Sequence, residues 1–216
     1  MLKVRTVLTL NIYNELIYLL ICYLIGSIPS GLIVGKLSRN VDIRNHGSGN
    51  LGGTNAIRVL GKTLGGIVVL LDVMKGVTSV FLAYYIFQTD IPTIMFGITA
   101  VVGHVFPIFA KFRGGKAVAT SAGVLIFSSP IILFIGLAAF IITLVISRYV
   151  SLSSTLAAII IFLSSIISYI YQDEPFFKYF YSDIYLVITI GIFLLFILWR
   201  HIPNYKRLFN KTERRI

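Results

Sequence analysis

Three polar segments of the chain carry side chains of the kinds that bind and polarise anions. The first, residues 45–66, reads NHGSGNLGGTNAIRVLGKTLGG and contains seven glycines. Backbone N–H groups in glycine-rich turns form anion-binding nests, and Asn side chains offer both donors and acceptors. Its candidate anion ligands are Gly47, Ser48, Gly49, Asn50, Thr54, Asn55 and Arg58. The alternative is a flexible loop with topogenic bases. Because glycine is a poor helix former, we expect little helix here.

The second polar segment, residues 103–120, reads GHVFPIFAKFRGGKAVAT. In it His104 lies near the end of an apolar stretch, and Gly114, Gly115 and Lys116 open the next one. A helix N-terminus beside a lysine is a natural phosphate site. The alternatives are an interfacial histidine with satisfied hydrogen bonds, and a lysine that only follows the distribution of positive charge in membrane proteins.

The third polar segment is the C-terminal WRHIPNYKRLFNKTERRI. Its side chains His201, Asn204 and Arg207 are three residues apart, so they share one face if the preceding helix continues. The alternative is a frayed basic tail.

Two of the apolar stretches are interrupted by polar residues. Ser27 and Ser30 lie beside Pro29, which predicts a broken helix of the kind that lines a cavity. Asp72 and Lys75 lie at positions i and i+3 of another stretch, so they can pair on one face. Ionisable groups in such a place are candidates for function, and a structural ion pair is the alternative.

The elements that must position these segments are membrane helices. Of the 216 residues, 57% are hydrophobic and only 12% are charged, and the mean hydropathy is +0.91. This composition excludes a soluble globular domain and a disordered chain. We therefore expect an all-α polytopic membrane protein, with residues 1–216 forming a single integral membrane domain. The net charge of +11 is explained by topogenic bases with a few anion ligands, rather than by nucleic acid. Three histidines, one cysteine and few carboxylates predict no metal centre.

The distribution of charge selects the number of spans. Apolar stretches cover residues 12–35, 64–87, 91–110, 117–128, 131–147, 152–171 and 184–200. Either 117–128 and 131–147 are separate, which gives seven spans, or they form one proline-kinked helix, which gives six. Seven spans place fifteen of the 19 basic residues on one side and three on the other. The positive-inside rule therefore predicts seven transmembrane helices, with the N-terminus outside and the C-terminus in the cytoplasm.

With that topology the polar segments meet at the cytoplasmic membrane surface. Their Ser, Asn, His, Lys and Arg side chains predict a phosphate-bearing ligand there. A transporter for an anionic solute is a rival interpretation, but it predicts internal repeats and polar groups near the bilayer midplane, and neither is evident. A purely structural membrane subunit leaves the glycine-rich polar segments without a purpose.

These motifs, in this order, resemble the bacterial acyl-phosphate:glycerol-3-phosphate acyltransferases, the PlsY family. The resemblance rests on GSIPSG at 26–31, GSGNLGGTN at 47–55 with Arg58, and GHVFP at 103–107 with Gly114-Gly115-Lys116. It extends from about Leu16 to Glu213. The chain departs from the family pattern at Gly53, where alanine is usual, and at Lys211, where glycine is usual.

The resemblance implies a multi-pass enzyme of the bacterial cytoplasmic membrane with its active site facing the cytoplasm. It would transfer an acyl group from acyl phosphate to the sn-1 hydroxyl of glycerol 3-phosphate, giving lysophosphatidic acid and inorganic phosphate in phospholipid biosynthesis. Its partners would be both substrates, membrane lipid and a peripheral enzyme that makes acyl phosphate from acyl carrier protein, and no cofactor is implied.

The residues present suit this chemistry. Acyl phosphate is already activated, so the site has to bind two phosphates, align the hydroxyl and stabilise developing charge. The predicted catalytic residues are Ser27, Asn50, His104, Lys116 and His201. The predicted phosphate ligands are Gly47, Ser48, Gly49, Thr54, Asn55, Arg58, Gly114, Gly115, Asn204 and Arg207. His104, His201 or a substrate phosphate could accept the hydroxyl proton, and the preference for acyl-chain length is not set by these motifs.

Overall fold

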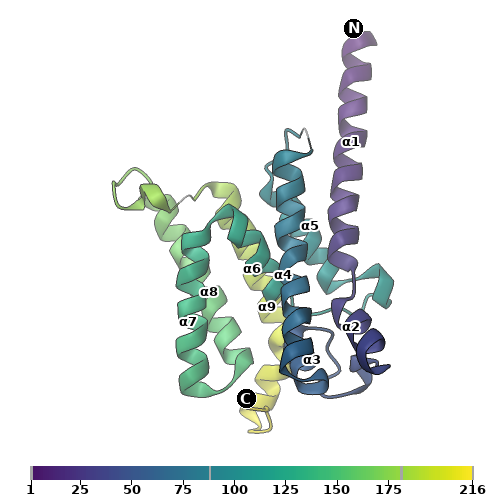
Figure 1. The fold of residues 1–216 in the computed structure, drawn as a ribbon. Helices are drawn as coiled ribbons and strands as arrows, with labels where there is room; N and C mark the ends of the chain where they lie inside the picture. The colour runs from purple at the N-terminus through teal and green to yellow at the C-terminus, as the bar shows by residue number, and fades with distance from the viewer. Residues whose placement is uncertain (1, 88, 181, 216) are drawn as a thin grey trace.

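The computed structural model describes residues 2–87, 89–180 and 182–215, and every regular element in these ranges is helical (Figure 1). The α-helices are α1 (Leu2–Ser27), α2 (Ser30–Arg39), α3 (Gly53–Leu60), α4 (Lys62–Tyr85), α5 (Ile94–Val105), α6 (Val118–Ser128), α7 (Pro130–Ser147), α8 (Val150–Ile170) and α9 (Ile184–Phe209). Three short 3-10 turns are η1 (Ile43–Asn45), η2 (Ile108–Ala110) and η3 (Phe177–Tyr179).

Five described helical stretches are long and apolar enough to cross a membrane. They are Ile12–Arg39, Lys62–Tyr85, Pro130–Ser147, Val150–Ile170 and Ile184–Phe209. Two shorter apolar stretches are Ile94–Ala110 and Val118–Ser128. Each of the seven apolar segments predicted from sequence therefore contains a helix. Large apolar side chains are exposed on the outer helices, such as Val145 and Ile146 on α7 and Leu195 on α9, as expected for a surface in contact with lipid.

The two predicted helix breaks are both present. Pro29 separates α1 from α2, and the flanking Ser27 and Ser30 are buried. Pro130 is the first residue of α7, where a proline needs no backbone donor. Residues 117–147 therefore form two helices, α6 and α7, and not one kinked helix. The last helix also continues beyond the apolar stretch, through Pro203 to Phe209, so His201, Asn204 and Arg207 share one face as expected.

The expectation of little helix in residues 45–66 is wrong. Residues 53–60 form α3, and α4 begins at Lys62. Two of the glycines delimit α3: Gly52 precedes it, and Gly61 ends it with a φ of 91°. The stretch 54–60 between them contains no glycine, so the propensity of the whole segment was a poor guide to its middle.

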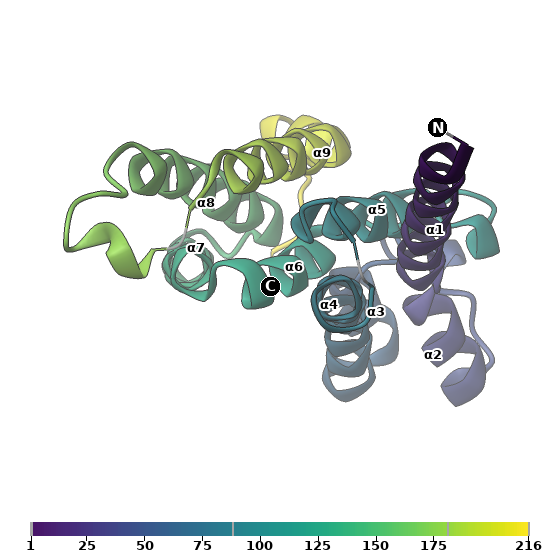
Figure 2. The same ribbon diagram turned by 90° about the horizontal axis from the view of Figure 1, so that it is seen from above.

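Close packing against α6 organises the bundle. Seen from above, α6 lies between α4 and α7, and α9 packs against both α5 and α8 (Figure 2). A Cβ atom added at Gly76 of α4 would collide with the Thr120 carbonyl oxygen, and one at Gly123 of α6 with the Val73 carbonyl oxygen. Small residues let membrane helices approach this closely. The contact fixes the start of α6, and therefore Lys116, relative to α4.

Candidate active site

Lys116 is the centre of the polar cluster at one end of the bundle. It lies in the turn between η2 and α6, and its Nζ donates a hydrogen bond to Asn204 Oδ1 of α9 at 2.5 Å. The two residues are 88 positions apart in sequence. The structure therefore joins the second predicted polar segment to the third.

The turn before Lys116 is held on two sides. The Arg200 guanidinium donates from Nε to the Gly115 carbonyl at 3.1 Å and from Nη2 to the Gly114 carbonyl at 2.9 Å. On the other side the Gly115 N–H donates to the His104 carbonyl at 3.1 Å. That N–H is therefore already occupied and does not point to an anion, although Gly115 is one of the predicted phosphate ligands. The two glycines instead allow a tight approach to His104.

Glu213 is the acidic member of the cluster. Its carboxylate accepts from Asn204 Nδ2 at 2.6 Å, from Arg207 Nε at 2.7 Å and from Ser151 Oγ at 3.2 Å. Glu213, Ser151 and Arg200 are not among the site residues predicted from sequence. The one available signal was that Glu213 is an isolated acid in a basic tail, since pairing between distant segments leaves no local pattern.

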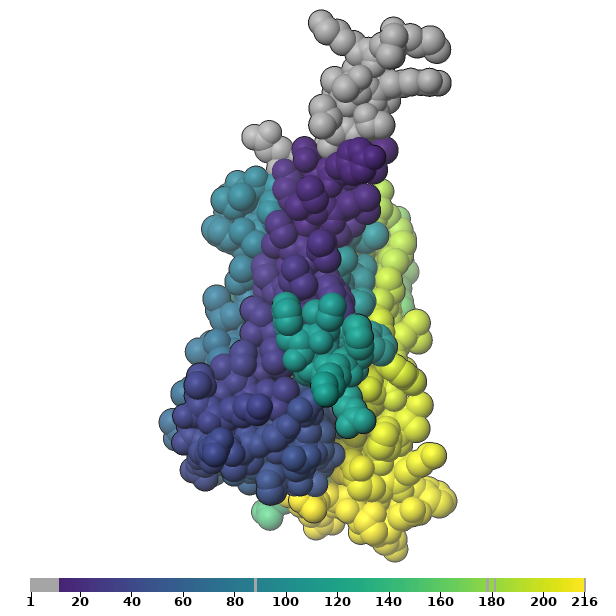
Figure 3. All heavy atoms as spheres, turned by 90° about the vertical axis from the view of Figure 1, so that its right-hand side faces the viewer, coloured from purple at the N-terminus to yellow at the C-terminus, as the bar shows by residue number. Residues whose placement is uncertain are grey.

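The first polar segment reaches the cluster through Arg58. Its Nη2 lies 3.4 Å from the Arg214 carbonyl oxygen, in the tail that carries Glu213. A second link joins this segment to the turn after α5, because Arg44 Nη1 donates to the Ala110 carbonyl at 3.3 Å. Figure 3 shows the same neighbourhood on the surface, where the teal residues following α5 lie between the purple and blue N-terminal part and the yellow C-terminal helix.

Asn55 has a different part from the one predicted for it. Its Oδ1 accepts from the Ser48 N–H at 2.7 Å, and its Nδ2 lies within hydrogen-bonding distance of the carbonyls of Ile43, His46 and Asn50. Both ends of the amide are therefore satisfied inside the loop, and the side chain is buried. It shapes the loop rather than offering donors to a ligand, because a buried polar group already hydrogen-bonded has little left to give.

The remaining predicted ligands of this loop line its outer side. Gly47 and Gly49 have positive φ of 62° and 71°, which turns the chain tightly around the Asn55 amide. Ser48 is exposed, and Asn50 and Thr54 are half-buried. Asn50 Oδ1 accepts the Gly52 N–H at 2.8 Å, which leaves its amide nitrogen free of any described partner.

The three remaining predicted catalytic residues, Ser27, His104 and His201, are all buried. Ser27 lies beside Gly103 at the end of α1, and its Oγ has no partner among the described residues. His201 Nδ1 lies 2.8 Å from the Ile197 carbonyl oxygen, one turn back along α9. If that nitrogen carries the proton, Nε2 is left as an acceptor.

The cluster has an excess of positive charge. Burial lowers the pKa of Lys116 to about 8; nearby Glu213 opposes the shift, and Arg207, Arg58 and Arg200 add to it. Burial also lowers the pKa of the Arg58 guanidinium. For Glu213 burial raises the pKa, but hydrogen bonds from Asn204 and Arg207 outweigh it, so the net shift is downward. Lys116 therefore feels three further cations and one carboxylate, an excess of positive charge that a multivalent anion would balance.

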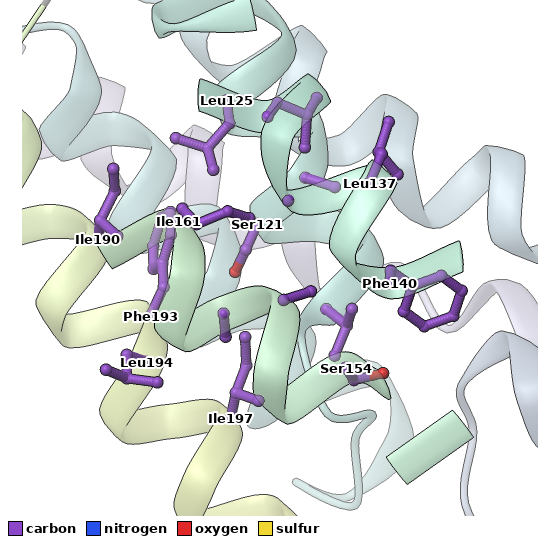
Figure 4. A pocket seen from close by; sticks show the side chains of 16 residues that line it. Ser121, Leu125, Leu137, Phe140, Ser154, Ile161, Ile190, Phe193, Leu194 and Ile197 are labelled. Carbon is purple, nitrogen blue, oxygen red and sulfur yellow. The ribbon is translucent and has the colours of Figure 1, made fainter. Parts of the chain in front are cut away.

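An apolar cavity of about 70 Å³ begins one helical turn from this cluster. It lies between α6, α7, α8 and α9, and Figure 4 shows its lining side chains. Val118, two residues after Lys116, and Ile197, four residues before His201, line it. Beyond them lie mainly aliphatic and aromatic groups, among them Leu125, Ile190 and Phe193.

A helical membrane bundle with a cationic cluster at one end and an adjacent apolar cavity defines a class: integral membrane proteins that handle amphipathic, anionic molecules. Residues 16–211 match the glycerol-3-phosphate acyltransferase family. The glycerol-3-phosphate acyltransferase of Bacillus subtilis (strain 168) is 47% identical over 198 residues, covering 92% of this chain and 95% of the relative. That of Geobacillus kaustophilus (strain HTA426) is 46% identical, covering 92% and 94%.

Solved structures agree. The fold matches a crystal structure of PlsY (YgiH), an integral membrane glycerol 3-phosphate acyltransferase, in its glycerol 3-phosphate form, with a TM-score of 0.82. The two are 33% identical, and the match covers 93% of this chain and 94% of that one. The lysophosphatidic acid form matches with a TM-score of 0.77. The chain therefore belongs to the glycerol-3-phosphate acyltransferase family, and it is an integral membrane acyltransferase of phospholipid synthesis.

Proposed function

We propose that this acyltransferase takes its acyl group from acyl phosphate and delivers it to the sn-1 hydroxyl of glycerol 3-phosphate. The new bond joins the hydroxyl oxygen to the acyl carbon, the carbon–oxygen bond to the phosphate breaks, and the hydroxyl proton is passed on. The products are lysophosphatidic acid and inorganic phosphate. The observation that carries this proposal is the cationic cluster of Lys116, Arg58, Arg200 and Arg207 next to an apolar cavity.

The charge of the cluster supports two phosphate-bearing substrates. Lys116, Arg58 and Arg207 carry charge that Glu213 compensates only in part. The amide of Asn204 bridges Lys116 and Glu213. The glycine loop with Ser48, Asn50 and Thr54 adds uncharged donors next to Arg58. These groups align the hydroxyl and stabilise charge on the acyl oxygen, and no enzyme nucleophile is required because phosphate is already a good leaving group.

The cavity beside α6 is suited to the fatty chain of the donor. Val118, two residues after Lys116, lines it, and its other lining residues come from the same four helices, α6, α7, α8 and α9. Burying methylene groups there contributes about 0.8 kcal/mol each. The acyl carbon would then lie where the cavity meets Lys116 and His201.

Two proton acceptors fit the site, and a single variant separates them. One is His201 through Nε2; the other is a substrate phosphate, whose second pKa is about 6. A general base contributes about 10²–10⁴ in rate. If His201→Gln keeps more than about a tenth of the wild-type kcat, the substrate phosphate is the proton acceptor. If kcat falls a hundredfold or more, His201 is the proton acceptor.

The membrane arrangement follows the distribution of charge. We propose seven spans, with the N-terminus outside and the cationic cluster facing the cytoplasm. The helix α6 has 11 residues and is about 16 Å long, roughly half the hydrocarbon thickness. The turn at 111–117 would therefore reach into the membrane from the cytoplasmic side, which brings Lys116 to a donor held by its chain in the lipid. A peripheral enzyme in the bacterial cytoplasm would supply acyl phosphate at the same surface.

The deciding experiment uses the purified full chain in lipid vesicles with palmitoyl phosphate and glycerol 3-phosphate, following phosphate release. Release that requires both substrates, and that Lys116→Ala reduces by at least a hundredfold, supports the proposal. The matched control is Lys206→Ala, which removes an exposed lysine next to Arg207 on the same helix and should keep the wild-type rate. Release without glycerol 3-phosphate, or equal rates in Lys116→Ala and wild type, would overturn it.

A further inference from the structure

Three ionisable side chains lie together in the interior, next to the Gly114–Gly115 turn. Asp72 and Lys75 of α4 are 2% and 6% exposed, and His104 of α5 is 6% exposed. Lys75 Nζ donates to Asp72 Oδ1 at 2.6 Å, and His104 Nδ1 lies 3.6 Å from the same carboxylate oxygen. Burying a charge costs several kcal/mol, so such a group requires a partner and a reason to be there.

The carboxylate and the ammonium balance one another, and the imidazole is the group they hold. Asp72 faces the Nδ1 edge of the His104 ring, which fixes the direction of the opposite edge. At that opposite edge, a Cβ atom added to Gly115 would collide with Nε2. The ring is therefore wedged between the Asp72 carboxylate and the backbone of Gly115, and Nε2 is covered by the turn.

The same turn sets the position of Lys116. The His104 carbonyl accepts the Gly115 N–H, and Arg200 holds the two carbonyls from the α9 side. The next residue, Lys116, then reaches Asn204. A shift of the ring would move Gly115, and a shift of Gly115 would move the ammonium away from the phosphate it binds.

From this chain of contacts we propose that Asp72, Lys75 and His104 are positioning residues for the phosphate-binding turn, and that His104 is not the general base. The ion pair orients the imidazole, the imidazole holds Gly114 and Gly115 in position, and the position of this turn sets the direction of the Lys116 side chain. This inference rests on the proposed function, in which Lys116 binds a substrate phosphate. It also gives the buried pair a purpose beyond packing, because the pair and the Gly115 backbone hold opposite edges of the same imidazole ring.

The first test separates positioning from base catalysis. His104→Gln should raise the KM for glycerol 3-phosphate by about tenfold, the weakening of one charge-assisted contact, with kcat changed less than about threefold and the pH profile of kcat unchanged. If His104 were the general base, its loss in His104→Gln would instead lower kcat by about 10²–10⁴ at constant KM. That second result would overturn the inference.

The second test asks whether the ion pair acts through His104. The double variant Asp72→Asn with Lys75→Gln replaces both charged groups by uncharged amides. We expect its KM for glycerol 3-phosphate to rise about as much as in His104→Gln, and the triple variant to show no further rise, because the effects pass through one path. A lower thermal stability with unchanged KM, or additive effects in the triple variant, would contradict the inference.

Ser79→Ala is the matched control, because it removes a buried hydroxyl one turn further along α4 that hydrogen-bonds the Lys75 carbonyl. It should leave KM unchanged. Different results refute the proposed function and the positioning role. A normal KM and rate in Lys116→Ala refutes the proposed function, whereas a defective Lys116→Ala with normal His104→Gln and double variants refutes only the positioning role.

Discussion

Filling the apolar cavity should discriminate against long acyl chains while leaving the phosphate chemistry intact. Ala122 of α6 lines the cavity of about 70 Å³, and Ala122→Leu would occupy most of that volume. Filling cavity volume in a protein interior contributes about 24 cal/mol of free energy per Å³. An acyl chain that can no longer fill this cavity therefore loses about 1.7 kcal/mol of binding free energy. This corresponds to a fall of about 18-fold in kcat/KM.

The loss should appear in the KM of the long-chain donor. Contacts made equally in the ground state and the transition state affect KM and not kcat, and the chain does not change as its carboxyl group reacts. The assay compares palmitoyl phosphate with acetyl phosphate, whose methyl group ends beside the cationic cluster. We expect Ala122→Leu to lower kcat/KM for palmitoyl phosphate and to leave acetyl phosphate and the KM for glycerol 3-phosphate unchanged.

Two controls make the result decisive. Ala138→Leu makes the same change at an exposed position of α7, so it should leave both donors unaffected. Thermal unfolding in detergent checks that Ala122→Leu is folded. Equal losses with palmitoyl and acetyl phosphate, or no loss with either, would refute the assignment of this cavity to the acyl chain.

Three further predictions follow from the cationic cluster, the tail and the topology. Lys116, with its pKa of about 8, loses its charge above pH 8, so the KM for glycerol 3-phosphate should rise there by up to about tenfold per pH unit. Lys116→Arg should remove this rise, because a guanidinium stays charged. The same rise of KM in Lys116→Arg would exclude Lys116 as its source. Lys211 has a φ of 56°, so Lys211→Gly should stabilise the protein by about 0.5 kcal/mol, since the relieved left-handed strain exceeds the entropy cost of glycine; a lower melting temperature would contradict this. Finally, an impermeant maleimide applied to intact cells should label Gln172→Cys but not Asn210→Cys, with the buried native Cys22 unreactive in both, whereas six spans would expose Asn210→Cys.

The helices could be predicted because their signals are local. Pro29 and Pro130 mark breaks by their covalent structure, and the apolar stretches have the length that a bilayer demands. The helix α3 was missed because glycines at its boundaries dominated the composition of the segment, although Gly52 and Gly61 only delimit it.

The sequence predicts which residue types meet in the polar cluster better than it predicts the hydrogen bonds between them. Lys116, Arg58, Asn204 and Arg207 were selected as cations or amides near the same surface, and they do converge. Asn55 was assigned to a ligand because its chemistry suits one, yet its neighbours in the loop use every donor and acceptor it has. Which carbonyls a side chain meets is decided by the folded loop, and no spacing rule contains that information.

The role of Glu213 shows why an acid belongs in a site for anions. Four cations held close together would repel one another, and burial already costs Lys116 part of its charge. Glu213 offsets this and joins separate elements, because it accepts from Asn204 and Arg207 of α9 and from Ser151 in the first turn of α8, where the helix dipole favours a negative group. One carboxylate against Lys116, Arg58, Arg200 and Arg207 leaves an excess of positive charge. That excess suits a bound phosphate, and it would be lost if a second acid balanced the cluster completely.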